Sequence, residues 1–330
     1  MRGETMVSLV GFSLRHAHKR VERLGDRLLA VEKMVDWERF RPLVAGLYDD
    51  DPETGGRPHT DEVVLVKCLV LQSWYNLADQ ELEYQLADRL SFQKFLGFPE
   101  TIPDYSTIWY CRERLTQSNQ LNKIWKELQH QLESHGFGVK KGVIQDASIV
   151  TADVGKKRQY LEKKATKEGR IITYKPKKLA HQDHDGSYTV KNDQVDFGYK
   201  IHQKCDVERG FIRSIDVSTA SLHDSQIDLS KKGDPPMYRD KGYAGVPPRN
   251  SKDFTMRKAY RNTPLTRADK LWNKRVSKKR AVGERPFAVI KRVFDRGHTL
   301  LKNLARVTVQ QFFNAFAFDV YNLYTYAKGR

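Results

Sequence analysis

The chain has 330 residues, with 58 Lys and Arg against 41 Asp and Glu, and its formal net charge is +17. A hydrophobic fraction of 39% and an aromatic fraction of 11% are typical of a globular protein and exclude a largely disordered chain. The surplus of positive charge predicts a polyanionic partner, most often nucleic acid. A generally basic, soluble protein is the alternative.

Hydropathy and cysteine usage indicate the cellular setting. No apolar run approaches the roughly 20 residues of a membrane helix, and the longest candidate, residues 62–77, is interrupted by Lys67. The N-terminus shows no signal-peptide core or cleavage site. Cys68, Cys111 and Cys205 contain no CxxC pair, which argues against a zinc site or a disulfide framework. We expect a cytoplasmic protein with reduced thiols and no membrane partner.

The first part of the chain has helical spacing of its apolar residues. The predicted helices occupy residues 14–48, 62–77, 79–96 and 105–136. Short helices joined by tight turns are compatible with a helix-turn-helix reader of DNA. A purely structural helical bundle fits the same pattern equally well.

From residue 140 the apolar pattern changes to that of strands and helices. Strands are predicted at 142–150, 197–207, 210–220, 235–245 and 255–260, and helices at 222–233, 264–278, 280–297 and 310–328. This order favours a mixed α/β sheet with helices on its faces.

A basic insertion at about 155–195 separates the first two predicted strands. From Lys156 to Lys178 it holds ten basic residues against two acidic ones, with Tyr160 and Tyr174 interleaved. This composition favours contact with a phosphate backbone, and a solvated loop is the alternative.

Three acidic residues lie at positions in the predicted elements that suggest a functional site. Asp146 lies inside the apolar strand "VIQDASIV", where a carboxylate is costly unless a partner or a metal compensates it. Asp240 follows a short strand, at the end where α/β sheets form sites, although a turn or cap is its ordinary role. Glu284 shares one face of a predicted helix with Arg280 and Lys291, and a solvated ion-pair stripe is the alternative there.

Carboxylates that converge from two strands and a helix suit hard cations such as Mg²⁺. Two such ions can serve an in-line phosphoryl displacement. A metal would explain why Asp146 is tolerated in its strand. Asp153 competes for that role, but it lies where the polar insertion begins, so we prefer Asp146. Arg280 and Lys291 would then hold a DNA phosphate.

These motifs resemble those of a DDE transposase of a prokaryotic insertion sequence, in the group named after insertion sequence five. The similarity covers nearly the whole length. "VIQDASIV" resembles the first catalytic motif and "YRDKGYAG" the second. Arg280, Glu284 and Lys291 fit the spacing of the third, whose tyrosine position is occupied here by Ser277.

The resemblance implies an N-terminal all-α, helix-turn-helix-like DNA-binding domain (1–137) and an RNase H-like mixed-sheet catalytic domain (138–330). Asp146, Asp240 and Glu284 become the metal-binding catalytic triad. The implied activity cleaves DNA at terminal inverted repeats and joins the 3′-hydroxyls to target DNA with two Mg²⁺ ions, for which Mn²⁺ can substitute. A homodimer on double-stranded DNA and a nucleoid-associated location are expected from the same class.

Three further residues are candidates for DNA contact. His223, in "SLHDSQ", either contacts DNA near the site or caps the helix that Asp224 begins. Arg112 and Arg114, in "DYSTIWYCRERL", are candidate phosphate contacts. The rival functions are a metal-dependent nuclease without strand transfer and a catalytically inactive, transposase-derived DNA-binding protein. A basic protein of another kind, associated with RNA or a membrane, is disfavoured by the three carboxylates.

Overall fold

The computed structural model describes residues 16, 19–48, 59–155, 182–191 and 193–329. The run of basic residues from 156 to 178 therefore lies outside the described residues. The chain forms two compact units, Met1–Phe137 with Phe316–Arg330, and Gly138–Ala315. Within the described ranges, no helix combines the length and apolarity needed to cross a membrane.

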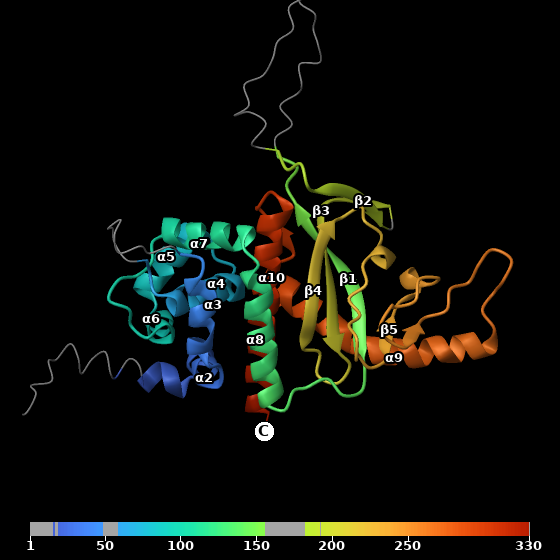
Figure 1. The fold of residues 1–330 in the computed structure, drawn as a ribbon, viewed down its shortest axis with the longest axis horizontal. Helices are drawn as coiled ribbons and strands as arrows, with labels where there is room; N and C mark the ends of the chain where they lie inside the picture. The colour runs from blue at the N-terminus through green and yellow to red at the C-terminus, as the bar shows by residue number, and fades with distance from the viewer. Residues whose placement is uncertain (1–15, 17–18, 49–58, 156–181, 192, 330) are drawn as a thin grey trace, which may run out of the picture. The chain divides into compact units, whose positions relative to one another are not determined.

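The first unit is helical, as the sequence predicts (Figure 1). Its helices are α2 (Arg27–Met34), η1 (Trp37–Phe40), α3 (Arg41–Ala45), α4 (Glu62–Tyr75), α5 (Asp79–Asp88), α6 (Leu90–Leu96), α7 (Tyr105–Gln117), α8 (Gln120–Ser134) and the later part of α10 (Leu304–Lys328). The runs expected at 79–96 and 105–136 are each divided in two, because the backbone is extended at Arg89 and Ser118.

The core of this unit surrounds α4, which is buried on nearly every side. The ring of Trp37 packs edge-on against Phe95 and at a tilt against Phe316. Lys67 interrupts the apolar sequence of α4, and its ammonium lies 5.5 Å from the Trp37 ring centre and 5.2 Å from that of Phe95. These cation–π contacts, together with Glu32 at 3.9 Å, make a buried lysine tolerable.

The second unit is a mixed sheet, which confirms the predicted α/β character. Its strands are β1 (Val143–Ala152), β2 (Ser187–Lys191), β3 (Gln194–Asp206), β4 (Ile212–Thr219), β5 (Met237–Arg239), β6 (Asp253–Thr255) and β7 (His298–Thr299). The main path runs β2-β3-β1-β5-β6, with β4 paired to β3 and β7 to β1. β1 is antiparallel to β3 and parallel to β5, so the first apolar strand is central.

Several element boundaries differ from the predictions. One helix, α9 (Arg267–Ala288), replaces the two expected at 264–278 and 280–297, and a π-helical turn, η5 (Val289–Val293), follows it. Val276 and Gly283, seven residues apart on one side of this helix, are both buried, and Gly283 lies against Ile144 of β1. The strand expected at 255–260 is β6, which ends at Thr255. The helix expected at 222–233 is only the short turn η3 (Asp224–Gln226).

Candidate active site

Strand register brings the first two predicted carboxylates to one level of the sheet. β1 and β5 are parallel, with Val143 opposite Met237 and Ile144 opposite Tyr238. Two residues further along each chain come Asp146 and Asp240. Because strand side chains alternate between faces, Asp146 lies on the same face of β1 as Ile144, and Asp240 directly follows the last residue of β5.

Asp146 is a partly buried carboxylate, with 21% of its side chain exposed. Its Oδ1 accepts a hydrogen bond from the N–H of Ala147 at 2.9 Å. Burial raises the pKa of Asp146, and the negative charges of Asp240 and Asp224 add to this, whereas Arg280 and the Ala147 N–H oppose it. The like charges show that the structure gathers acidic groups around this strand.

Asp240 is held by the turn that follows β5. Its carboxylate caps the short helical turn η4 (Lys241–Tyr243), and its Oδ1 accepts the N–H of Gly242 at 2.8 Å. A Cβ at position 242 would lie 2.9 Å from that same oxygen. Glycine in "DKGYAG" therefore allows the turn to close on the carboxylate and fix its direction.

Helix α9 lies close against β1, and a glycine permits the approach. A Cβ at Gly283 would come within 2.8 Å of Ile144 Cγ2. Gln203, the β3 partner of Asp146, donates a hydrogen bond from Nε2 to the carbonyl of Gly283 at 3.0 Å. One helical turn earlier, Arg280 donates from Nη2 to Asp146 Oδ2 at 2.9 Å. Arg280, which the sequence interpretation expected at a DNA phosphate, thus forms an ion pair with the first predicted carboxylate.

Glu284 is exposed on α9, one turn after Arg280. In the part of the chain that the structure describes, no three Asp, Glu, His or Cys side chains come together closely enough to hold a metal ion. The charge of Asp240 acts on Asp146. Glu284, which the sequence predicts as the third member, does not join the two aspartates in a cluster of three among the described residues. Asp153, the competing candidate, is exposed just after the end of β1, 3.6 Å from His298.

The donor set of Asp146 and Asp240 fits a hard divalent cation. Two carboxylates are kept near one another although their like charges raise the pKa of Asp146. The guanidinium of Arg280 supplies the positive charge at one of the Asp146 oxygens. Carboxylate oxygens are the ligands that Mg²⁺ takes in proteins, and such a cation would offset the same charge.

Asp224 is an acidic neighbour of the site that the sequence interpretation did not select. Its Oδ1 lies 2.7 Å from Lys200 Nζ, and its charge raises the pKa values of Asp146 and Tyr243. Burial is the main cause of the raised pKa of Tyr243, and Asp146 and Asp240 also contribute. The signal was available, because Asp224 follows His223 in the motif "SLHDSQ".

Two residues expected at DNA have local roles in the structure. His223 caps η3, where its Nδ1 accepts the N–H of Ser225 at 3.3 Å, as the structural alternative anticipated. Its ring is exposed. Lys291 is half-buried and donates from Nζ to the carbonyl of Ile149 at 2.6 Å. This hydrogen bond ties η5 to β1. Burial lowers the pKa of Lys291.

The two arginines expected to contact phosphate differ in environment. Arg112 donates to Asp79 Oδ2 at 2.6 Å and to Gln72 Oε1 at 2.7 Å, which links α7 to α5 and α4. Arg114 is exposed, and its guanidinium carbon lies 4.4 Å from the ring centre of Tyr48. The phosphate contacts of both residues stay predictions, and Arg112 has a structural role in addition.

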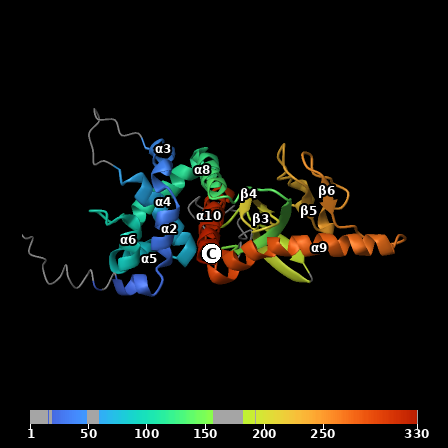
Figure 2. The same ribbon diagram turned by 90° about the horizontal axis from the view of Figure 1, so that it is seen from below.

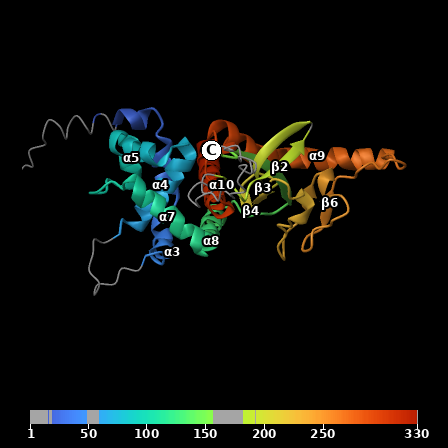
Figure 3. The same cartoon turned by 90° about the horizontal axis from the view of Figure 1, so that it is seen from above.

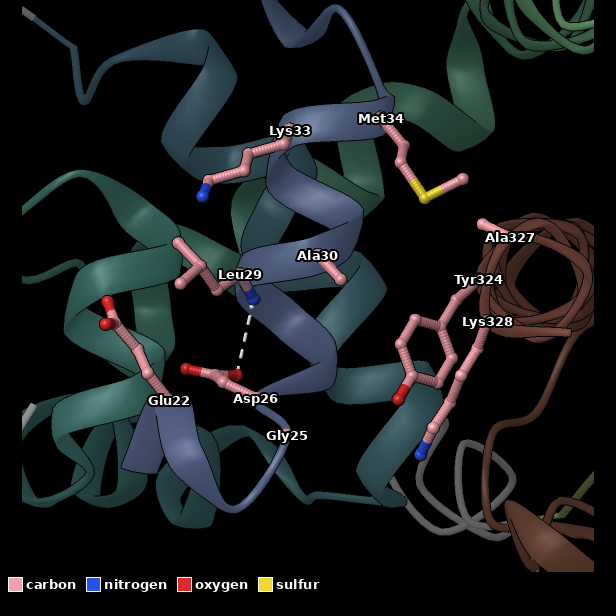
Figure 4. Close-up of a pocket in the computed structure, with 10 residues that line it drawn as sticks. All are labelled: Glu22, Gly25, Asp26, Leu29, Ala30, Lys33, Met34, Tyr324, Ala327 and Lys328. Carbon is pink, nitrogen blue, oxygen red and sulfur yellow. Dashed lines mark hydrogen bonds between the residues drawn. The ribbon is translucent and has the colours of Figure 1, made fainter. Parts of the chain in front are cut away.

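A pocket in the first unit lies between α2 and the end of α10 (Figure 4). Its lining includes Lys33, Tyr324 and Lys328. None of the carboxylates described above contributes to it. The pocket is therefore not part of the candidate active site.

Comparison with known families gives two matches. The family described as Transposase DDE domain matches residues 146–319, more than half of the chain, and the match begins at Asp146. The family described as Transposase domain (DUF772) matches residues 15–114. No solved structure matches the chain.

Proposed function

The chain belongs to the family of transposases with a DDE catalytic domain, and from this we propose that it cuts DNA at the terminal inverted repeats of a mobile element and joins the 3′-hydroxyls to target DNA. Its family makes it a DNA transposase, an enzyme that cleaves and transfers DNA strands. The sequence resemblance and the RNase H-like fold class are thereby confirmed. Recognition of the inverted repeats belongs to the proposal.

Enzymes of this family use divalent metal ions. We assign Asp146, Asp240 and Glu284 as the residues that hold two Mg²⁺ ions, with Mn²⁺ as a substitute. When bound, such ions neutralise charge at the scissile phosphate and favour deprotonation of the attacking oxygen. The observation that supports this assignment most strongly is the electrostatic proximity of Asp146 and Asp240 on adjacent strands.

The chain's own groups position the reactants. The Gly242 N–H orients the Asp240 carboxylate, and the Ala147 N–H orients that of Asp146. Arg280 lies beside Asp146 and is suited to hold a phosphate oxygen through its planar guanidinium. Water or a DNA 3′-hydroxyl is the nucleophile, so no covalent protein–DNA intermediate is needed.

We also propose a division of labour between the two units. Residues 1–137 would bind the element ends, with Arg112 and Arg114 as phosphate contacts, and the part from residue 138 onward would carry the chemistry, with Lys291 and His223 near the DNA. A homodimer would bring two element ends together. The reaction would take place on the chromosome of a prokaryotic cell, in the cytoplasm.

The test is strand cleavage and joining on a labelled duplex that carries the inverted repeat flanking the gene, with Mg²⁺ or Mn²⁺. The wild type is compared with Asp146→Asn, Asp240→Asn and Glu284→Gln. We expect the wild type to cut and join, and each variant to bind the duplex but do neither. Cutting without joining would indicate a nuclease, and binding alone would indicate an inactive DNA-binding protein. Activity in any of the three variants would remove that residue from the triad.

A further inference from the structure

Helix α9 carries a stripe of basic side chains along one side. The stripe consists of five exposed residues at helical spacing: Arg267, Lys270, Lys274, Lys278 and Arg285. Steps of three, four and seven residues keep side chains on one face of a helix with 3.6 residues per turn. The opposite face holds Val276 and Gly283, which are buried against the sheet.

Most of the charge of this stripe has no acidic partner among the described residues. Within those ranges, Arg267, Lys270, Lys274 and Lys278 form no ion pair. Asp269, in the first turn of α9, is engaged in the capping box with Thr266. Elsewhere an exposed arginine does find acidic partners, since Arg41 pairs with Glu38, Asp61 and Glu62. The side chains of Arg267, Lys270, Lys274 and Lys278 are therefore available to an external polyanion.

The geometry of α9 suits a duplex. Figures 2 and 3 show the first turns of α9 extending beyond β5 and β6. From Arg267 to Arg285 the helix rises about 27 Å, at roughly 1.5 Å per residue. That length corresponds to about eight base pairs of DNA, and lysines contact its phosphates without reading sequence.

The stripe and the carboxylate site lie on different sides of the same helix. Arg280 and Gly283 point toward Asp146 and Ile144 on β1, whereas the stripe points away from the sheet. A helix with its side chains is about 10–12 Å across. A DNA segment whose phosphate lies at Asp146 is therefore separated by the helix from a segment lying on the stripe.

We infer that the outer face of α9 binds duplex DNA through its phosphates, at a segment other than the one being cut. This inference rests on the proposed function, because a strand-transfer reaction involves more than one stretch of DNA. The segment is the target duplex, because the stripe contacts phosphates without reading sequence and the element ends are assigned to residues 1–137.

The first measurement is the affinity for a random-sequence duplex of 30 base pairs. Fluorescence anisotropy gives this affinity at a series of salt concentrations. The variant is K270Q/K274Q/K278Q, and the charge-matched control is K140Q/K231Q/K232Q, at three exposed lysines of the second unit. We expect the stripe variant to bind 10- to 100-fold more weakly. Its slope of log K against log salt should fall by about 2.7, because each phosphate that a lysine neutralises adds roughly 0.9 to that slope. The control should bind like the wild type.

A second measurement tests the choice of the target duplex. We expect the stripe variant to cut the element end normally and to lose joining to an added duplex. A loss of affinity that instead grows as the element-end duplex is extended by about eight base pairs would overturn this choice and place the element end on the stripe. An unchanged affinity and salt slope in the stripe variant, with correct folding by circular dichroism, overturns the inference. A wild type that neither cuts nor joins, yet binds through the stripe, overturns the proposed function alone.

Discussion

Arg280 Nη2 lies 2.9 Å from Asp146 Oδ2, so a residue of α9 is joined to a carboxylate in the middle of the sheet. Both side chains are partly buried, with 15% and 21% of their surfaces exposed. The pair supplies a cation from within the chain at the carboxylate that we assign to metal binding. A metal ion would therefore compete with this ion pair for the same carboxylate.

Replacing Arg280 should strengthen metal binding. In Arg280→Gln, a metal ion no longer has to displace the guanidinium from Asp146. The variant also lacks a positive charge that would repel the metal ion. We expect Mn²⁺ to bind roughly three- to tenfold more tightly, which corresponds to about 0.7–1.4 kcal/mol. Titration calorimetry without DNA measures this. The control is Arg275→Gln, which replaces an exposed basic residue of the same helix. An equal gain in Mn²⁺ affinity in this control would contradict the role of the ion pair.

Enlarging Gly283 should move α9 away from β1. In Gly283→Ala the new Cβ meets Ile144 Cγ2 at 2.8 Å, and such overpacking costs about 1–3 kcal/mol. The better helix propensity of alanine offsets up to about 1 kcal/mol of this. We expect a lower free energy of unfolding in urea and slower DNA cleavage. Ile144→Leu removes that methyl group and should partly restore both, and no restoration would point to another cause.

Arg112 should matter for stability more than Arg114. Arg112→Gln breaks the contact with Asp79 and leaves a partly buried carboxylate without its cation, at a cost of about 1–3 kcal/mol. Arg114 is exposed and stacks on Tyr48, so Arg114→Gln should cost less than about 1 kcal/mol. Urea unfolding of both variants gives the comparison. Equal costs would show that the Arg112 network contributes little.

His202 should make stability depend on pH in a defined window. Burial lowers its pKa to about 4, whereas the unfolded chain has the ordinary value of about 6.5. Between these values the unfolded state binds more protons, so the free energy of unfolding rises as the pH increases. The full effect is at most about 3.4 kcal/mol, at roughly 1.36 kcal/mol per pKa unit.

The check is urea unfolding at several pH values from 4 to 7. His202→Gln should lose this part of the pH dependence, while His135→Gln, at an exposed histidine, should keep it. A wild-type slope that persists in His202→Gln would assign the effect to other groups. Carboxylates also titrate in this range, so the difference between wild type and variant is the quantity to compare.

The sequence by itself determined the class of elements, and it supplied the acidic residues that we propose for the site. Asp146 could be selected because a charge inside an apolar strand needs compensation, and Asp240 because it follows the next short strand. Both signals depend only on residues close in the chain. The helical first part and the mixed sheet after it follow from hydrophobic period in the same way. The continuity of α9 was not predicted, and the close approach of Gly283 to Ile144 on β1 is a tertiary contact that no local pattern shows.

Only the tertiary structure decided which residues meet. The contacts of Arg280 with Asp146 and of Arg112 with Asp79 join positions 134 and 33 residues apart. No local pattern encodes such pairs, because they depend on strand register and on how closely a helix approaches its sheet. The same reason explains why the contact of Lys291 with the carbonyl of Ile149 was not predicted, whereas the cap formed by His223 is local and was among the sequence alternatives. The sequence pattern shows which charged residues lie in unusual positions, and tertiary packing determines which groups they contact.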